Sequence, residues 1–314
     1  MRSNGWGLGS KCPPADLALI AVAAIWGLTF PIVRCTVTRV SALQFLQLRF
    51  LCASAALMPV ALLRARPRAL FDPRALAPGL CLAAGYWLQT EGLRSVGASA
   101  SAFLTGTSVV IVPFLAQVLG WERAGVRRWT AALLALLGVC AVQGWLPSRW
   151  SAGEAWTFLC AVAFAAQILL LSRLAPRGGD PLVLGAGQVL SATLLLFIVG
   201  AFRGEIAVGH AIPGGIAAAA VFTGLAATAA ALAVQTWAQS RVPAGHVAVC
   251  FATEPVFAAF YSVGFCGDRL SPLGWLGCVL VVVATLLVAT ERNAYASRAP
   301  SGPVRRTCPR GASR

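Results

Sequence analysis

The chain has 314 residues, of which 58% are hydrophobic and only 11% are charged. Soluble domains carry about 25% charged residues, so this composition excludes a water-soluble fold and predicts a helical membrane protein. The formal net charge of +15 would suit a nucleic-acid partner, but the positions of the basic residues explain the charge without one.

Ten stretches of the chain are apolar enough and long enough to cross a bilayer as helices. A transmembrane helix needs about 20 mostly apolar residues, and such windows occur at 17–34, 41–63, 75–93, 96–119, 129–146, 154–172, 181–202, 211–238, 244–266 and 271–290. The segments between them are short and leave no room for an inserted soluble domain. We therefore expect an all-α polytopic membrane protein with ten transmembrane helices.

The basic residues indicate how these helices are oriented. With the N-terminus in the cytoplasm, 18 of the 25 Lys and Arg residues lie in cytoplasmic segments and six on the opposite side. This is the positive-inside bias of membrane proteins, and it predicts that both termini are cytoplasmic. The leader 1–15 and the basic tail 292–314 have the composition of disordered ends.

Polar side chains in the first three windows are candidates for a substrate-binding cavity. Trp26 lies in the middle of the first window, Gln47 and Arg49 lie in the second, and Tyr86 and Gln89 lie in the third. Membrane helices also use Gln, Trp and Tyr to pack, to hydrogen-bond one another and to anchor at interfaces. Each uncharged candidate therefore has a structural interpretation beside the functional one.

Arg49 is the one basic residue well inside a window. A charge near the bilayer centre costs about 2.5–3.5 kcal/mol on insertion scales, so such a residue faces a cavity or a partner. Arg49 either attracts an anionic group of a substrate or forms an ion pair with Glu254. Glu91, in the third window, stands three residues before Arg94, and we expect these two to pair near the membrane surface.

The seventh and ninth windows supply the remaining polar candidates. Gln188 lies in the middle of the seventh window, and Glu254 is the deepest acidic residue of the chain. Glu254 is therefore a candidate for substrate binding or for proton coupling. Pro113 and Pro255 lie in the fourth and ninth windows, and because proline frees a backbone carbonyl, both are candidate helix breaks.

The chain repeats itself with an offset of 146 residues. Residues 96–142 then align on 242–288 without gaps, so that Thr107 coincides with Thr253 and Trp129 with Trp275. A repeat unit of five helices is odd in number, so the second unit enters the membrane from the opposite side. Inverted repeats of this kind build many secondary transporters, with the substrate site near the midplane between the halves.

Three stretches also carry a family pattern: "AAIWGLTFPIVR" (23–34), "LQTEGLRSVGASASAFLTGTSVVIVPFLAQVLGWER" (88–123) and "ATEPVFAAFYSVGFCGDRL" (252–270). They resemble the EamA-like transporters of the drug/metabolite transporter (DMT) superfamily. The resemblance implies a first repeat at 16–146 and a second at 150–291. It also implies a multi-pass permease of the cell inner membrane that moves small metabolites such as amino acids, often outward.

Missing residue types restrict the chemistry further. Lys11 is the only lysine, which excludes a P-loop for ATP, and the two histidines do not form an H-E-x-x-H motif. We therefore expect no enzymatic activity, no cofactor and no bound metal. An intramembrane enzyme would need a nucleophile–base pair or a metal cluster, and a receptor or assembly factor would normally add a soluble domain.

Together these features predict a secondary active or facilitative transporter that exports small metabolites by alternating access. Its partners would be a small-molecule substrate and the lipid bilayer, without nucleic acid. The substrate, the coupling ion and the oligomeric state stay open at the level of sequence.

Overall fold

The computed structural model describes residues 13–121, 125–143, 151–175, 180–207, 213–266 and 271–296. Every regular element in these ranges is a helix, as the composition predicts. Seven helical segments of the described chain are long and apolar enough to cross a membrane. Nearly all of the leader 1–15, and the tail 292–314 from residue 297 onward, lie outside the described residues.

Three of the ten predicted windows form helices that are not among these seven segments. They are α3 (Pro73–Gly92), α6 (Val126–Gln143) and α13 (Pro272–Ala296). Glu91 lies in the last turn of α3, and Arg127 and Arg128 lie in the first turn of α6. In α13, the residues whose side chains are described form an apolar helix over Pro272–Leu287.

The first part of the chain forms helices that begin and end at recognisable signals. Besides α3 and α6, it contains α1 (Pro13–Val37), α2 (Ala42–Arg64), the 3-10 helix η1 (Pro67–Phe71), α4 (Ala98–Gly106) and α5 (Ser108–Val118). Ser41 caps α2 by accepting a hydrogen bond from the Leu43 amide at 3.2 Å. Asp72 caps α3 in the same way, from the Arg74 amide at 2.8 Å. These side chains satisfy amides that the first helical turn leaves unpaired.

The second part of the chain follows a similar order of elements. It contains α7 (Ala152–Leu174), α8 (Pro181–Arg203), α9 (Gly214–Gly224), the π-helical turn η3 (Leu225–Ala230), α10 (Ala231–Gln239), α11 (Ala244–Phe251), α12 (Glu254–Cys266) and α13. Ser151 and Glu154 form a capping box at the start of α7. Gly204 ends α8 with a φ of 68°, a left-handed conformation that glycine adopts at little cost.

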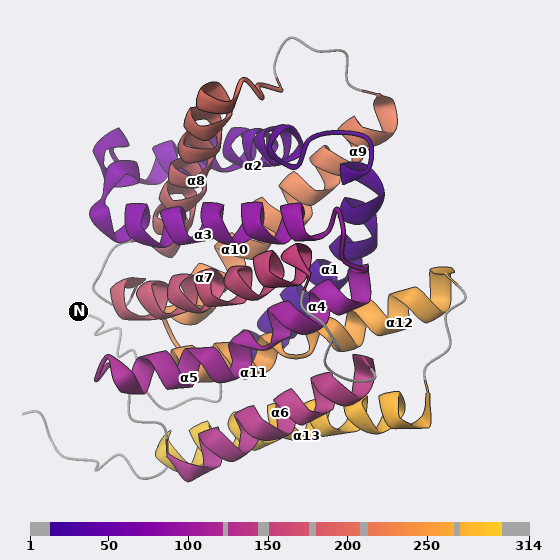
Figure 1. Ribbon diagram of the computed structural model, residues 1–314. Helices are drawn as coiled ribbons and strands as arrows, with labels where there is room; N and C mark the ends of the chain where they lie inside the picture. The colour runs from indigo at the N-terminus through magenta and orange to yellow at the C-terminus, as the bar shows by residue number, and fades with distance from the viewer. Residues whose placement is uncertain are drawn as a thin grey trace, which may run out of the picture.

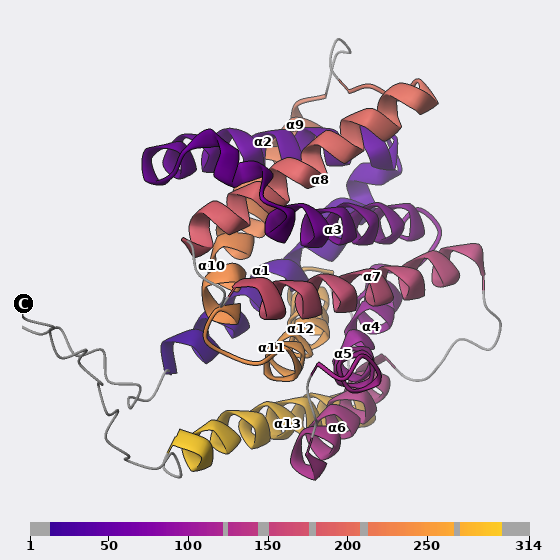
Figure 2. The same cartoon turned by 90° about the vertical axis from the view of Figure 1, so that its left-hand side faces the viewer.

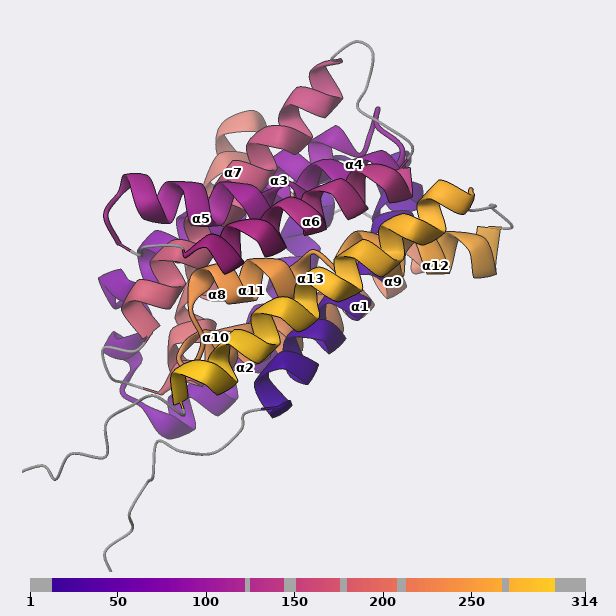
Figure 3. The ribbon, with the colours of Figure 1, turned by 90° about the horizontal axis from the view of Figure 1, so that it is seen from below.

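The helices form one bundle with two distinct edges. In Figure 1, α2, α8 and α9 lie at the top and the α6–α13 pair lies at the bottom, and Figure 2 keeps this order. Seen from below in Figure 3, α6 and α13 run alongside each other beneath the rest of the bundle. Between the edges, α3 packs on α7, and α1 packs on α10 and α12. The centre of the bundle is therefore built from segments far apart in sequence.

Two helices of the centre are interrupted at corresponding places. The fourth window divides at Thr107, between α4 and α5, and the ninth divides at Ala252 and Thr253, between α11 and α12. Thr107 donates its hydroxyl to the Leu104 carbonyl at 2.6 Å, and Thr253 donates to the Cys250 carbonyl at 2.7 Å. Threonine hydroxyls that bond a preceding carbonyl compete with the helical ladder.

The predicted proline breaks lie close to these interruptions without coinciding with them. Pro113 lies inside α5, and the division of the fourth window precedes it. Pro255 lies in the first turn of α12, after the division of the ninth window. Because the first helical turn does not need its amide donors, proline is tolerated there. Pro255 therefore lies in the first turn of a helix and does not interrupt one.

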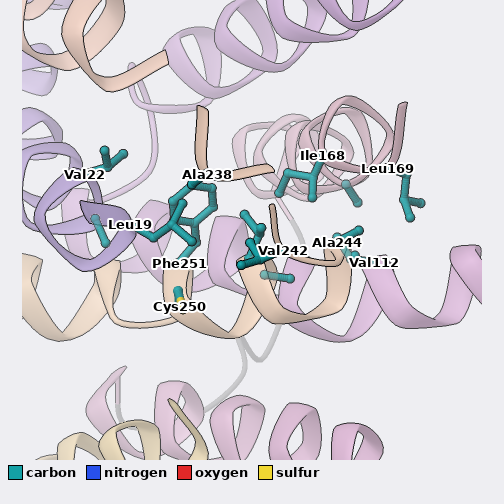
Figure 4. Close-up of a cluster of buried hydrophobic side chains, with 14 of the residues drawn as sticks. Leu19, Val22, Val112, Ile168, Leu169, Ala238, Val242, Ala244, Cys250 and Phe251 are labelled. Carbon is teal, nitrogen blue, oxygen red and sulfur yellow. The ribbon is translucent and has the colours of Figure 1, made fainter. Parts of the chain in front are cut away.

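An apolar cluster fills one end of the centre (Figure 4). It joins Leu19 and Val22 of α1, Ile168 and Leu169 of α7, and Phe251 of α11. These side chains are all at most 6% exposed. They bring together the N-terminal part of α1, the C-terminal part of α7 and α11, so the bundle is closed at this end.

Candidate functional site

A cavity with an empty volume of about 580 Å³, its mouth included, lies in the centre of the bundle. Its walls come from α1, α3, α4, α5, α7, α10, α11 and α12: Trp26, Thr29, Leu82, Tyr86, Gln89, Thr105, Gly106, Ser108, Phe164, Gln167, Ile168, Gln235, Phe251 and Glu254. Both parts of the chain thus contribute to one site.

Glu254 is the one residue with a formal charge among those that line this cavity. The interruption before it makes Glu254 the first residue of α12, where the partial positive charge of the helix N-terminus favours a carboxylate. No hydrogen bond or ion pair of its carboxylate is found among the described residues. The carboxylate is therefore left for a ligand, a proton or water.

Gly27 of α1 lets α12 approach closely beside Glu254. A Cβ atom at Gly27 would lie 2.9 Å from the Ala258 amide nitrogen and 3.0 Å from both the Glu254 carbonyl oxygen and the Phe257 Cβ. Real Cβ atoms are not found that close to backbone, so only glycine fits between these helices at the present distance. The absent side chain at Gly27 helps to place Glu254 at the cavity.

Aromatic rings form much of the remaining wall. Trp26 donates its indole N–H to the Ala227 carbonyl at 2.7 Å, and its ring centroid lies 4.8 Å from that of Phe251. The Tyr86 ring meets Phe164 edge to face at 5.2 Å. Such contacts are favourable beyond simple burial, so these rings are held in place before a ligand arrives.

A chain of amide side chains runs along the α7, α8 and α10 side of the site. Gln188 donates to the Thr236 hydroxyl at 2.9 Å and accepts from Gln167 at 2.9 Å. Gln235 donates to Gln167 at 3.1 Å and to Gln239 at 2.7 Å. Gln167 and Gln235 line the cavity, whereas Gln188, fully buried, supports them from behind.

Arg49 is buried behind Tyr86. Its side chain is 1% exposed, its Nε donates to the Thr228 hydroxyl at 2.7 Å, and its guanidinium carbon lies 4.4 Å from the Tyr86 ring centroid. Tyr86 lines the cavity and Arg49 does not. In the described part of the chain, no ion pair joins Arg49 to Glu254, and its Nη2 has no hydrogen-bond partner.

Gln47 lies at the α2–α8 edge of the bundle, where it bonds to backbone groups. It is completely buried and donates to the Leu196 and Glu205 carbonyls at 3.2 and 2.9 Å. Its side-chain oxygen accepts from the Ala207 amide at 2.8 Å. These bonds attach α2 to the end of α8 and the segment that follows it.

The structure thus divides the residues that the sequence singled out. Trp26, Tyr86, Gln89 and Glu254 line one cavity, and Gln89 donates to the Thr105 hydroxyl at 3.1 Å. Arg49, Gln47, Gln188, Pro113 and Pro255 do not line it. The predicted Glu91–Arg94 pair is confirmed, with 3.2 Å between Oε1 and Nη1.

The apolar part of the wall is what sequence reasoning missed. Leu82, Phe164, Ile168 and Phe251 line the cavity, but in a chain that is 58% hydrophobic an apolar residue carries no distinguishing signal. Gln167 and Gln235 do carry a signal in the sequence, since a buried amide in a membrane helix needs a hydrogen-bond partner.

One group of side chains outside the cavity has the donor atoms of a metal site. Asp16 of α1 and His246 and Cys250 of α11 bring their ligand atoms within 4.8 Å of one another. Oxygen, imidazole and thiolate ligands together suit Zn²⁺, and these residues are the ones that could hold it, although the sequence predicts no metal. His246 Nε2 lies 2.7 Å from Asp16 Oδ1, so the pair also connects α1 to α11 directly.

Comparison with known protein families gives two matches within the chain. The model of the EamA-like transporter family matches residues 13–143 and again residues 151–290. The chain belongs to the EamA-like transporter family. With its apolar helices, this EamA-like protein is a multi-pass membrane protein, and its family points to transport of a small molecule rather than to catalysis.

Individual proteins agree with the family assignment. The EamA-like chain is 28% identical over 294 residues to a protein of Archaeoglobus fulgidus described as an uncharacterized transporter, covering 92% of this chain and 90% of that protein. A solved crystal structure superimposes with a TM-score of 0.73 at 17% identity, covering 92% of this chain and all of that one. The second likeness supports the fold alone.

Proposed function

We propose that this EamA-like protein is a secondary active or facilitative transporter that binds its substrate in the central cavity and works by alternating access. The observation that carries this proposal is the composition of the cavity wall. Four of its helices, α1, α3, α4 and α5, precede residue 144, and the other four, α7, α10, α11 and α12, follow residue 150. A site shared by two halves changes its access when one half moves against the other.

The proposal includes ten spanning helices arranged as two inverted repeats, at 16–146 and 150–291. The two family matches support this division, as do the interruptions at Thr107 and Thr253, which the offset of 146 residues aligns. The helix contacts also support two related halves, because the first helix of each half packs on helices of the other half. α1 packs on α10 and α12, and α7, its proposed counterpart, packs on α3 and α4.

The proposed location is the cell inner membrane, with both termini in the cytoplasm, because the basic residues are concentrated in the segments that this orientation makes cytoplasmic. The proposed substrates are small metabolites such as amino acids, moved in the export direction. No P-loop occurs in the sequence, so the driving force is the gradient of the substrate or of an ion. Glu254 is the proposed proton-coupling group.

The residues of the site have separate proposed roles. Trp26, Tyr86, Gln89 and Glu254 contact the substrate, because they line the cavity. Arg49 holds the Tyr86 ring in position, Gln188 holds the amides of the wall, and Gln47 holds α2 against the end of α8. Pro255, the residue after Glu254, fixes the first turn of α12.

Counterflow in proteoliposomes tests the proposal. Vesicles that contain the purified protein and an unlabelled metabolite should accumulate the same labelled metabolite, and a panel of metabolites identifies the substrate. Glu254→Gln should abolish the response to a pH gradient, while Glu91→Gln, an acid that pairs with Arg94 outside the cavity, should keep it. Folded, reconstituted protein that exchanges no compound of the panel would end the proposal.

A further inference from the structure

The hydrogen bonds of the amide chain run in one direction, because backbone carbonyls fix both of its ends. At one end, the Gln239 amide nitrogen donates to the Ile168 carbonyl at 2.9 Å. A carbonyl can only accept, so the Gln239 side-chain oxygen is left to accept the bond from Gln235. At the other end, the Thr236 hydroxyl donates to the Leu232 carbonyl at 2.7 Å, so it must accept from Gln188.

This direction of the hydrogen bonds leaves one side-chain oxygen of the chain without a donor. Gln235 uses its nitrogen for both Gln167 and Gln239, and its side-chain oxygen has no hydrogen-bond partner in the described part of the chain. Gln235 is 1% exposed and lines the cavity. A buried acceptor without a partner costs about 1–3 kcal/mol, a cost that a ligand with an N–H or O–H donor removes.

Glu254 is a second acceptor of the same cavity, and it carries a negative charge when ionised. Its carboxylate has no partner among the described residues. No Lys, Arg or His belongs to the lining, since the guanidinium of Arg49 lies behind the Tyr86 ring. The two unpaired groups identified in the lining, the Gln235 oxygen and the Glu254 carboxylate, are both acceptors, which favours a ligand that donates and is positive.

The aromatic wall favours the same charge. Trp26, Tyr86, Phe164 and Phe251 line the cavity, and the face of an aromatic ring attracts a cation. The rings also offer apolar surface to a ligand. A carboxylate in this cavity would meet Glu254 with no cationic side chain in the lining to balance it, since the Tyr86 ring stands between the cavity and Arg49.

We propose that the cavity binds small molecules that carry a protonated primary or secondary amine on an aromatic or apolar body. The ammonium group lies at the Glu254 carboxylate, and an N–H donor of the ligand meets the free oxygen of Gln235. This inference rests on the proposed function and narrows its substrates to amines. A quaternary ammonium, which has no N–H, satisfies the charge but leaves the Gln235 oxygen unpaired.

The test uses four compounds of similar shape on the purified full-length protein in detergent. They are 2-phenylethylamine, trimethyl(2-phenylethyl)ammonium, 2-phenylethanol and 3-phenylpropanoate, and affinity is measured by titration calorimetry and by the rise in the thermal unfolding midpoint. The primary amine should bind about tenfold more tightly than the alcohol and the carboxylate, because charge-assisted hydrogen bonds are the stronger ones. The primary amine should also bind about tenfold more tightly than the trimethyl compound, because the trimethyl compound has no N–H to donate to the Gln235 oxygen.

Variants of Glu254 locate the effect. Glu254→Gln should remove the advantage of the amine over the alcohol, and Glu254→Asp should keep part of it. Glu91→Gln, which changes an acid outside the cavity, should leave all four affinities unchanged. The comparison among compounds on the unaltered protein decides the proposal even where a variant does not fold.

Three outcomes would overturn the inference: tighter binding of the carboxylate, equal binding of the primary and trimethyl compounds, or binding of none of the four. The proposed function has its own test. A protein that exchanges anionic metabolites in counterflow refutes the amine subsite and keeps the transporter, whereas a protein that exchanges nothing refutes both.

Discussion

Buried amide side chains serve two purposes in this EamA-like transporter. At the α7–α8–α10 wall they form a hydrogen-bonded chain in which the side-chain oxygen of Gln235, a residue of the cavity lining, has no partner among the described residues. At the α2–α8 edge, Gln47 instead satisfies two carbonyls and one amide of the backbone. A buried backbone group needs a partner, so Gln47 is needed by the fold whether or not a substrate is bound.

Replacing Gln47 tests this structural role. Gln47→Leu keeps the approximate size of the side chain but leaves the Ala207 amide and the Glu205 carbonyl without these bonds. We expect a loss of about 2–4 kcal/mol in the free energy of unfolding, seen as a lower unfolding midpoint. Gln44→Leu, on the partly buried face of the same helix, is the matched control and should change the midpoint little. Folded Gln47→Leu protein that keeps its stability but loses ligand binding would instead place Gln47 in the site.

Glu205, just after α8, makes the stability of the same edge of the bundle depend on pH. The hydroxyl of Ser41, and next the guanidinium of Arg203, lower the pKa of this carboxyl below its ordinary value. A carboxyl whose pKa is lowered in the folded state stabilises that state above its unfolded pKa, and this contribution is lost as the pH falls through the folded pKa.

The unaltered protein and Glu205→Gln should therefore differ most near neutral pH. We expect a difference of about 1 kcal/mol or less, since the group is partly exposed. The difference should shrink as the pH falls below the usual range of a glutamate. Unfolding midpoints in detergent from pH 7 to pH 3 measure it, and a difference that grows toward low pH would contradict the assignment.

Among the elements, α12 depends on the absence of a side chain at Gly27. Gly27→Ala should push α12, and with it Glu254, away from α1. Overpacking of this kind costs about 1–3 kcal/mol, and the displaced carboxylate should weaken ligand binding as well. Gly264→Ala is the control in α12 itself, because a Cβ there meets nothing within 4 Å. It should be neutral or slightly stabilising, because alanine is the better helix former.

The sequence predicts the helices well because their signals are local. The apolar length of a helix and the Glu91–Arg94 spacing can both be read from the sequence itself. The division at Thr107 instead of at Pro113 and the π-helical turn η3 were not predicted. A threonine that bonds a preceding carbonyl is common in intact helices too, so its sequence does not distinguish the two cases.

The candidate site was predicted only in part because burial behind another residue is a tertiary property. Arg49 and Tyr86 both read as polar residues in apolar helices, yet one shields the other from the cavity. Likewise, Gln188 and Gln235 look alike in sequence, and only the packing of α7, α8 and α10 decides which of them lines the wall.

In the whole molecule, the contact between Asp16 and His246 joins the first part of the chain to the second. His246 is 3% and Asp16 21% exposed at the side chain, and they lie next to the apolar cluster of Figure 4, which includes Cys250. Under alternating access, this end of the bundle must open during the cycle. If the proposed alternating access operates, we expect this contact to stabilise the form that is closed at this end.

Weakening that contact should expose the end of the bundle. We expect Asp16→Asn to increase the rate at which a maleimide labels Cys250 by about fivefold or more, because the bond involves a charged group. The experiment uses a protein that keeps Cys250 as its only cysteine, and Arg94→Gln, which breaks a pair elsewhere, serves as control. A protein with Cys35 alone, an exposed position, gives the upper limit of the rate. An unchanged labelling rate would show that this contact does not restrain opening.

The π-helical turn η3 has a consequence for how the family can vary in length. One residue rotates an ordinary α-helix by about 100°, so a deletion in α8 would turn its buried face outward. The wider turn at Leu225–Ala230 already accommodates an extra residue between α9 and α10. A deletion there returns the segment to an ordinary helix and leaves Gln235, Thr236 and Gln239 on their present face. Among descendants of a common ancestor, single-residue gaps between α9 and α10 should accumulate at η3, because a residue lost there leaves the binding wall in place.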